Sequence, residues 1–496
     1  MPEINVATYE CELAQLDVDV LLLPVFQSAD RAAPWEAFDE ALGGRISEAI
    51  NSRPFSGKVR RSLAVPLPAG NGPGEILLVG LGKGDELTPR RYREALAAAT
   101  SLAVARHGES IAIASREDAL SGPEHAAAAC EAVLLSQYRF DRYRKPAEDA
   151  TQLAQLRLPA GEGVDEAVER AQRVCRAVAW ARDLINLSPS DKRPPALADL
   201  VAEMATEVGL RCQIIDEAGA RELHMGALLA VARGSTTEPR LVVLEHAPEA
   251  QAGQAPVVLV GKGVTFDTGG ISIKPSASMD EMKADMSGAA AVVATMRAIA
   301  ELQLPRRVVA VVPMAENMPD GNAYRPGDLV TAMNGKVIEV LNTDAEGRMI
   351  LADALAYGVG EFSPRCIVDL ATLTGACVVA LGEDVAGVMT NDDGLAAQLI
   401  AAGTEVAEPL WQLPMFDEYD ELIKSKVGDI KNTGGRWGGA ISAAKFLENF
   451  VGDTRWAHLD IAGPAYRTKA RPLTPRGGAG FAVRLLVHWL QQPDGS

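Results

Sequence analysis

The sequence predicts an α/β protein with two domains, and three observations support this prediction. The chain has 496 residues, of which 48% are apolar, enough for two separately buried cores. Short runs rich in β-branched residues alternate with segments that carry apolar residues at helical spacing, which is typical of layered α/β proteins. A polar stretch with prolines and glycines at 145–164 interrupts this alternation and predicts a domain boundary.

The N-terminal part combines apolar runs with alanine- and leucine-rich segments. We expect strands at 18–26, 75–80 and 110–115, and helices at 88–105 and 124–143. A long helical segment follows at 164–187. The pair Pro194-Pro195 then begins a helix through Val208, because proline is favoured in the first helical turn.

The C-terminal part resumes the alternation with short strand-like runs. We expect strands at 241–244, 257–260, 308–312, 337–341 and 366–370, and helices at 287–302, 349–358 and 443–450. The run 257–260 is apolar at every position, as in a central strand that is covered on both faces.

The charge balance narrows the classes of partner. The chain carries 48 lysines and arginines against 66 aspartates and glutamates, a net charge of −18. Such an acidic protein is a poor overall match for nucleic acid or an anionic membrane surface. The N-terminal sequence lacks a basic segment followed by an apolar stretch, and six scattered cysteines form no disulfide framework. We expect a protein of the reducing cytoplasm without membrane contact.

One basic cluster stands out against this acidic background. Residues 139–145 read Arg-Phe-Asp-Arg-Tyr-Arg-Lys and interleave positive with aromatic side chains. Such a cluster could contact the phosphates of DNA. It is also typical of a helix end, where positive charge interacts favourably with the helix dipole. The helix end is the favoured interpretation, and DNA binding is the alternative.

Two carboxylates follow the apolar run 337–341. If the chain is extended there, Asp344 and Glu346 project to the same side, at the point where a strand gives way to a helix. Ligands of open α/β sheets usually lie at such strand ends. Taken alone, the segment is better explained by a helix start, with Asp344 as the N-cap and Glu346 as a first-turn charge.

A second polar segment changes this balance. The run 257–260 leads into a glycine-rich stretch that carries Lys262, Asp267 and Lys274, and Asp285 follows near the start of a helix. Neither of the common glycine-rich phosphate-binding motifs is present. Surface lysines paired with aspartates are the alternative explanation of the stretch.

The four acids of the two segments could converge on cations. If Asp267, Asp285, Asp344 and Glu346 meet, each pair of carboxylates separated by 4 Å repels by about 4 kcal/mol at an effective dielectric constant near 20. Two divalent cations would balance four carboxylates, and carboxylate ligands suit Mn²⁺, Mg²⁺ or Zn²⁺. No histidine lies in these segments, which disfavours a single histidine-ligated zinc site.

The two segments resemble the signature of the leucyl aminopeptidase family (peptidase family M17), the cytosolic aminopeptidases with two metal ions. Residues 342–348 read Asn-Thr-Asp-Ala-Glu-Gly-Arg, and 261–275 read Gly-Lys-Gly-Val-Thr-Phe-Asp-Thr-Gly-Gly-Ile-Ser-Ile-Lys-Pro. The likeness continues at 282–285, 315–318, 326–328 and 371–375, and it covers roughly residues 180–480. It departs at 190–194, Ser-Asp-Lys-Arg-Pro, where the family usually has an asparagine-proline run.

The resemblance implies an architecture and an assembly. It implies a smaller, macro-like N-terminal α/β domain and a larger α/β catalytic domain with a mixed central sheet flanked by helices. We expect the N-terminal domain at 1–160, a linker helix at 161–190 and the catalytic domain at 191–496. The family usually forms hexamers whose active sites face an internal cavity, which would admit small peptides.

The resemblance also implies a ligand set for two divalent ions, Mn²⁺ or Zn²⁺. Asp267 and Glu346 would contact both ions, Lys262 and Asp285 would complete one site, and Asp344 would complete the other. A lysine ligand must be neutral, because an ammonium group has no lone pair to donate. An ordinary salt bridge is the alternative for Lys262.

The reaction implied is the release of N-terminal amino acids from peptides by attack of a metal-bridging hydroxide. Lys274 would stabilise the oxyanion, and Arg348 would hold a bicarbonate ion that acts as general base. A dinuclear phosphoesterase is an alternative, against which the lack of histidine ligands argues.

The substrate pocket is expected beside this centre. Thr372, Leu373 and Gly375 would supply hydrogen bonds and part of the wall. Met282 would lie in the pocket for the N-terminal side chain, with a core methionine as the alternative. An apolar pocket separates neighbouring aliphatic side chains by only about 1–3 kcal/mol, so we expect broad specificity with leucine favoured.

Overall fold

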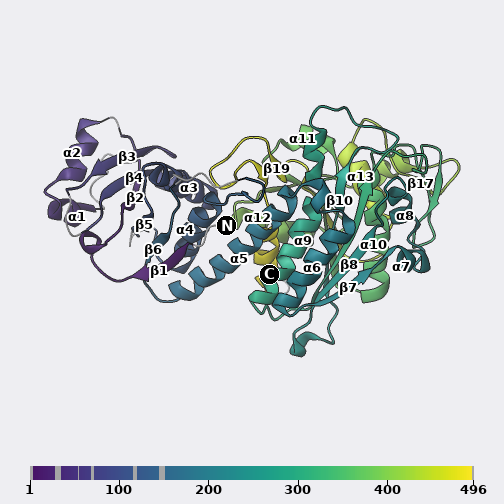
Figure 1. Cartoon of the computed structure of the whole chain (residues 1–496), viewed down its shortest axis with the longest axis horizontal. Coiled ribbons are helices and arrows are strands. Elements are labelled where there is room, and N and C mark those ends of the chain that lie inside the picture. The colour runs from purple at the N-terminus through teal and green to yellow at the C-terminus, as the bar shows by residue number, and fades with distance from the viewer. Residues whose placement is uncertain are drawn as a thin grey trace. The chain divides into compact units, whose positions relative to one another are not determined.

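A computed structural model describes residues 4–27, 35–53, 55–68, 72–115, 120–144 and 151–493. The chain forms two compact α/β units (Figure 1). Residues 1–179 with 469–476 make up the first unit, and 180–468 with 477–496 make up the second. The predicted two-domain α/β fold is confirmed. The division falls within helix α5 (Val164–Asn186), and the domain boundaries expected from the sequence stay a prediction.

A six-stranded sheet forms the centre of the first unit, in the order β1-β6-β5-β2-β4-β3. Its strands pair in parallel except for β3, which is antiparallel to β4. Strand β2 is buried at nearly every position, as expected for a strand covered on both faces. The elements are β1 (Asn5–Tyr9), β2 (Val20–Phe26), β3 (Ser62–Pro66), β4 (Glu75–Gly82), β5 (Ser110–Ile113), β6 (Gln155–Pro159), α1 (Glu36–Ala41), α2 (Arg45–Ser52), α3 (Pro89–Ala105) and α4 (Pro123–Ser136).

Helix α4 is shorter than the sequence predicts. The expected helix at 124–143 ends at Ser136, because the alanine-leucine run that packs into the core stops at Leu135. The basic cluster at 139–145 therefore lies beyond the helix, and its interpretation as a helix end is wrong. Phe140 and Tyr143 pack edge to face there, with ring centroids 5.7 Å apart, and Lys145 is outside the described residues. DNA binding stays a prediction.

A nine-stranded mixed sheet forms the centre of the second unit, in the order β16-β15-β18-β14-β9-β11-β8-β7, with β10 also paired to β11. The neighbours β18, β14, β9 and β11 are parallel, whereas β8, β7 and β15 pair antiparallel. The strands are β7 (Arg211–Ile215), β8 (Arg240–His246), β9 (Val257–Gly261), β10 (Gly263–Asp267), β11 (Val308–Asn317), β14 (Cys366–Ala371), β15 (Ala386–Thr390), β16 (Leu410–Gln412) and β18 (Trp456–Asp460).

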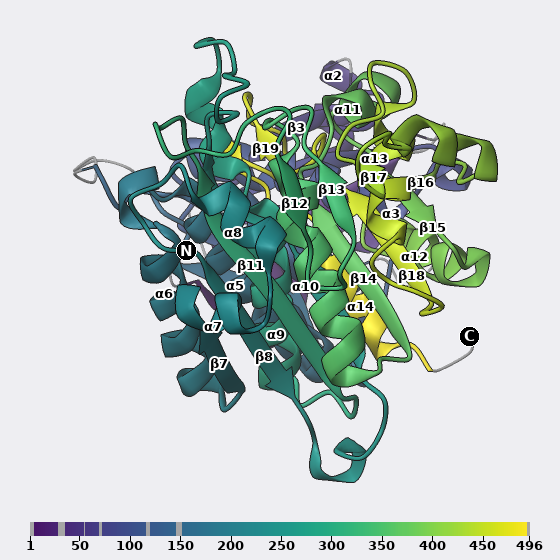
Figure 2. The same cartoon turned by 90° about the vertical axis from the view of Figure 1, so that its right-hand side faces the viewer.

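Helices cover both faces of this sheet (Figures 1 and 2). Helices α8, α10 and α13 pack together on one face, and α6, α9 and α14 on the other. The helices are α6 (Pro194–Val208), α7 (Glu217–Glu222), α8 (Gly226–Ala232), α9 (Ser287–Glu301), α10 (Glu346–Phe362), α11 (Gly375–Leu381), α12 (Asp393–Glu405), α13 (Gly439–Glu448) and α14 (Val483–Gln491). The small strands are β12 (Leu329–Thr331), β13 (Val337–Glu339), β17 (Ile430–Lys431), β19 (Tyr466–Arg467) and β20 (Gly477–Gly478).

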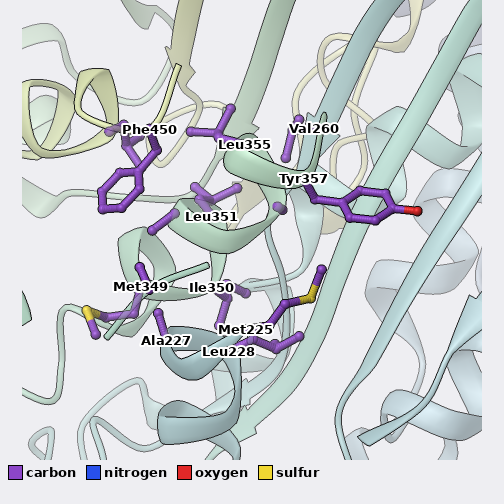
Figure 3. Close-up of a cluster of buried hydrophobic side chains, with 14 of the residues drawn as sticks. Met225, Ala227, Leu228, Val260, Met349, Ile350, Leu351, Leu355, Tyr357 and Phe450 are labelled. Atoms are coloured by element: carbon purple, nitrogen blue, oxygen red, sulfur yellow. The ribbon is translucent and has the colours of Figure 1, made fainter. Parts of the chain in front are cut away.

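Helix α10 is a core helix, and its packing fixes the position of its N-terminus. Figure 3 shows Met349, Ile350, Leu351 and Leu355 among side chains of α8, β9 and the segment after α13. These residues have no measurable solvent exposure. Complete burial of such side chains stabilises by about 1.5–3 kcal/mol each, so the first turn of α10 is rigidly held. In the part of the chain that the structure describes, no helix is long and apolar enough to cross a membrane.

Candidate active site

Several parallel strands of the second unit end at one edge of its sheet. Lys262 follows β9, Asp267 ends β10, Asn317 ends β11 and Thr372 follows β14. Asp267 and Asn317 are direct partners in the register of β10 and β11. The carboxyl edge of an open α/β sheet is the usual place for a ligand, and these side chains therefore mark the candidate site.

The segment with Asp344 reaches this edge by a different path from the expected one. Strand β13 ends at Glu339, so the idea of a strand leading directly into Asp344 is wrong. Asn432 redirects the chain: it accepts a hydrogen bond of 2.8 Å from the Leu341 N–H and donates one of 2.7 Å to the Asn342 carbonyl. These two hydrogen bonds with a side chain take the place of the backbone hydrogen bonds that a neighbouring strand would make.

Asp344 lies in the resulting turn, and Glu346 is the first residue of α10. The N-cap position of α10 is Ala345, and no side chain caps the helix, so the alternative role of Asp344 as N-cap is also wrong. Glu346 is buried at the positive end of the helix dipole, which favours a carboxylate there.

The structure brings the predicted carboxylates together. Asp267, Asp344 and Glu346 each offer an oxygen atom, and these three atoms lie within 4.8 Å of one another. Asp285 joins them through Lys262, whose Nζ lies 2.7 Å from Asp285 Oδ1 and 3.0 Å from Glu346 Oε1. Four acids from the two polar segments therefore form one cluster, and all four line a cavity of about 560 Å³.

Two lysines compensate part of the negative charge. Lys262 bridges Asp285 and Glu346, and Lys274 Nζ lies 2.7 Å from Asp267 Oδ2 and 2.5 Å from Asp344 Oδ1. Two ammonium groups against four carboxylates leave two negative charges uncompensated in a site with little exposure. A divalent cation is the usual remedy for such an excess of buried negative charge.

Orphaned oxygen atoms support this interpretation. Among the residues that the structure describes, Asp285 Oδ2 and Glu346 Oε2 are buried and have no hydrogen-bond partner. Leaving such a group unsatisfied costs about 1–3 kcal/mol or more for a charged atom. Hard divalent cations bind carboxylate oxygens of this kind, so the donor set fits a metal centre.

The protonation of the cluster follows from burial and mutual charge. Burial, reinforced by the Glu346 carboxylate, raises the pKa of Asp267 and of Asp285. For Lys262, burial acts to lower the pKa, but Asp285 and Glu346 outweigh it and the pKa is raised. Without metal, Lys262 is therefore a counter-ion, and it could act as a ligand only after a cation has displaced its proton.

Further residues, for which the sequence alone predicts no role, hold the carboxylates in place. The Asn317 amide donates hydrogen bonds of 2.8 Å to Asp267 Oδ1 and 2.9 Å to the Thr343 carbonyl, and the Tyr324 hydroxyl donates to the same carbonyl at 2.8 Å. Asn317 lies in the family-like segment 315–318, which is the only signal that pointed to it. Its amide links the two polar segments directly.

The residues expected to form the pocket wall line the same cavity. Thr372, Leu373 and Gly375 follow β14, and Met282 comes from the short 3-10 helix η6 (Met279–Ala284). The Thr372 hydroxyl donates to Asp285 Oδ1 at 2.7 Å, and its carbonyl accepts from Lys262 at 2.8 Å.

Asp460, at the end of β18, holds the loop after β14. It accepts hydrogen bonds from the Leu373 N–H at 3.2 Å and from the Thr374 hydroxyl at 2.6 Å. Asp460 is completely buried, and no sequence pattern predicts its role.

Arg348 is placed differently from the other site residues. It is buried in the first turn of α10 and is not part of the cavity lining. Its Nη1 donates to the Asn432 carbonyl at 2.9 Å, while its buried Nε has no partner in the described structure. Burial lowers the pKa of Arg348 to about 10. The guanidinium thus retains a donor that an anion could use.

Comparison with known families agrees with this geometry. The catalytic-domain model of the cytosol aminopeptidase family matches residues 179–487, and the model of that family's N-terminal domain matches 22–147. The chain belongs to the cytosol aminopeptidase family. This aminopeptidase is therefore a hydrolase that acts on peptides, and its family is metal-dependent.

Similar proteins cover almost the whole aminopeptidase chain. A probable cytosol aminopeptidase of Syntrophotalea carbinolica is 45% identical over 96% of this chain and 97% of its own. The cytosol aminopeptidase of Pseudomonas aeruginosa is 44% identical, with the same coverage of both chains.

Two solved structures share the fold. A mutant of tomato leucine aminopeptidase has a TM-score of 0.90 and 34% identity, and covers 99% of this chain and 97% of its own. The bottromycin maturation enzyme BotP in complex with Mn has a TM-score of 0.84 and 37% identity, with 96% and 99% covered.

Proposed function

We propose that this aminopeptidase releases N-terminal amino acids from peptides, with leucine favoured within a broad range, and that it holds two divalent cations. The cluster of four carboxylates, three of them buried, with its orphaned oxygens is the observation that supports the proposal. Asp267 and Glu346 would contact both cations, Lys262 and Asp285 one of them, and Asp344 the other. Mn²⁺ and Zn²⁺ are the candidates, and the Mn complex of BotP supports the former for this chain.

The cations, when bound, would supply Lewis acidity that activates water and polarises the scissile carbonyl. The chain's own groups would do the rest. Lys274 reaches into the cavity between Asp267 and Asp344, so its ammonium group would stabilise the oxyanion formed from the scissile carbonyl. Asp285 would orient the free α-amino group of the substrate, which explains the need for an unblocked N-terminus. Met282, Thr372, Leu373 and Gly375 would enclose the first side chain.

Arg348 would hold a bicarbonate ion that supplies the general base. Two observations support this role: the cavity lining contains no histidine, and the buried Nε of Arg348 has no hydrogen-bond partner in the described structure. Adding bicarbonate should therefore raise the turnover of the unmodified enzyme and leave Arg348→Ala unaffected.

The decisive experiment measures hydrolysis of leucine p-nitroanilide together with bound metal. Exhaustive chelation should abolish turnover, and Mn²⁺ or Zn²⁺ should restore it. Asp344→Asn should lose turnover and lower the metal content, whereas Asp393→Asn, exposed at the start of α12, should do neither. Full turnover without metal would reject the proposal.

We also propose a cytoplasmic homohexamer. Large apolar side chains of the second unit are exposed in the isolated chain, among them Trp411 at 65%, Phe416 at 63% and Trp437 at 76%. Exposed aromatic groups of this kind are typical of interfaces between proteins. Light scattering should give six times the chain mass, and a monomeric mass would contradict this assembly.

A further inference from the structure

Lys192 is a buried lysine that the proposed reaction does not use. It has no measurable solvent exposure and follows the short 3-10 helix η4 (Pro189–Asp191), before α6 begins at Pro194. A buried charge persists only when close partners compensate it, so its partners indicate what it does.

Three backbone carbonyls surround the Lys192 ammonium group. Its Nζ donates hydrogen bonds to Leu184 O at 3.1 Å, Ile185 O at 2.6 Å and Lys283 O at 2.7 Å. The first two carbonyls belong to the last turn of α5, where a positive charge interacts favourably with the helix dipole. Burial lowers the pKa of Lys192, but three carbonyl acceptors match the three N–H groups of an ammonium ion.

The third carbonyl belongs to η6, which carries the site. In the sequence, Lys283 lies between Met282, which lines the wall of the cavity, and Asp285, which contributes a carboxylate to it. A 3-10 helix has poor hydrogen-bond geometry of its own, and η6 begins after Ser278, a non-glycine residue with φ of 61°. Contacts with the rest of the unit must therefore hold η6 in place.

We infer that Lys192 is a positioning residue for the active site. Its ammonium group links the main chain of η6 to the end of α5. This contact fixes the position of Asp285 and Met282 relative to the cavity. The inference rests on the proposed function, in which Asp285 binds a cation and Met282 lines the pocket for the first side chain. Lys192 itself touches neither cation nor substrate.

The test replaces Lys192 by methionine, which keeps the length of the side chain and removes the charge. Calorimetric titration of the metal-free variant with Mn²⁺ should show two binding steps. The affinity of one step should be about 10- to 100-fold weaker than in the unmodified enzyme, and that of the other should be unchanged. The KM for leucine p-nitroanilide should rise as well, because Met282 shifts with η6. Hydrogen exchange should speed up at residues 279–285.

Lys445→Met is the matched control. Lys445 is also a buried lysine, 3% exposed, but it lies in α13 and contacts Glu448 and Asp420. This variant should lower the melting temperature without changing either binding step. Equal effects of Lys192→Met and Lys445→Met on the binding of Mn²⁺ would overturn the inference.

A parallel Asp285→Asn variant separates the two proposals. If Asp285→Asn leaves both binding steps unchanged, the proposed ligand set is wrong. If it weakens one step and Lys192→Met weakens neither, only the positioning role is wrong. Should Lys192→Met not fold, Lys192→Gln takes its place. Failure of both to fold, while Lys445→Met folds, would make Lys192 a residue of general stability and overturn the inference.

Discussion

Gly347 packs directly against the side chain of Lys262. A Cβ atom placed on Gly347 would lie 2.5 Å from Lys262 Cε and 2.7 Å from its Nζ, closer than atoms can approach. The absence of a side chain in the first turn of α10 therefore creates the space in which the Lys262 amine meets Asp285 and Glu346.

Gly347→Ala should separate stability from metal binding. Alanine favours a helix by about 1 kcal/mol over glycine, which offsets the displacement of Lys262, so the free energy of unfolding should change by less than about 1 kcal/mol. The affinity for one cation should fall by about 10- to 100-fold. Gly360→Ala, in the same helix with open space around it, should keep full affinity. Urea denaturation and calorimetric titration measure the two quantities, and unchanged affinity in Gly347→Ala would contradict the expectation.

Asn317→Leu should weaken the metal centre by releasing Asp267. The substitution removes the amide that joins Asp267 to the Thr343 carbonyl and leaves both acceptors without this donor. We expect a loss of about 1–3 kcal/mol in the free energy of unfolding and weaker binding of both cations, since Asp267 is the proposed bridging ligand. Asn391→Leu, which breaks a similar bridge between Thr454 and Trp456, should destabilise without affecting metal content.

Lys274→Gln should lower turnover while metal stays bound. Removing an oxyanion-stabilising charge typically lowers kcat by about 100- to 1,000-fold. The melting temperature of the metal-free variant should also be lower, because Asp267 and Asp344 lose their shared counter-ion. Metal analysis by mass spectrometry and single-turnover kinetics test the two effects. A variant that loses its metal along with its activity would assign Lys274 to the binding of cations instead.

Asp353 should make stability depend on pH. Its carboxylate is completely buried in α10 and accepts from the Leu228 and Met333 N–H groups at 2.8 Å each, and burial raises its pKa to about 7. The folded state therefore binds a proton between about pH 4 and pH 7 that the unfolded chain has released. The free energy of unfolding should fall as the pH rises through this range, by an amount on the order of 4 kcal/mol.

Asp353→Asn isolates this contribution. The amide of the variant does not titrate, so the difference in unfolding free energy between the variant and the unmodified protein should change between about pH 4 and pH 7 and level off above it. Urea denaturation of the chelated proteins at several pH values provides the measurement. Parallel pH profiles of the two proteins would show that Asp353 stays ionised in the folded state.

The sequence predicts the framework of the second unit well, because burial on both faces makes its central strands continuously apolar. β9, β14 and the first half of β11 lie where the apolar runs are, and α6 starts at Pro194. The edge strands β7 and β16 escaped prediction, and so did β10, β15 and β18, since their apolar positions depend on neighbours that are distant in the sequence.

The carboxylates of the site could be predicted because charged residues, whose burial costs free energy, follow apolar strands. The path of the chain to them could not. Asn432 turns the segment before Asp344, although it lies far along the sequence. Asn317, Asp460 and Lys192 were missed for the same reason: a buried polar residue discloses its role only through the partner that the fold brings to it.

The hydrogen bonds of Asp460 to the loop after β14 have a consequence for the nascent chain. All the proposed cation donors precede β14 in the chain, whereas Asp460 ends β18, the strand that lies between β14 and β15 in the sheet. A ribosome-bound fragment that stops before β18 therefore carries every donor but lacks the hydrogen bonds of Asp460 to Leu373 and Thr374. We expect the enzyme to stay inert during its own synthesis, so that the amino termini of nascent proteins nearby are safe from it until translation of this chain is nearly complete.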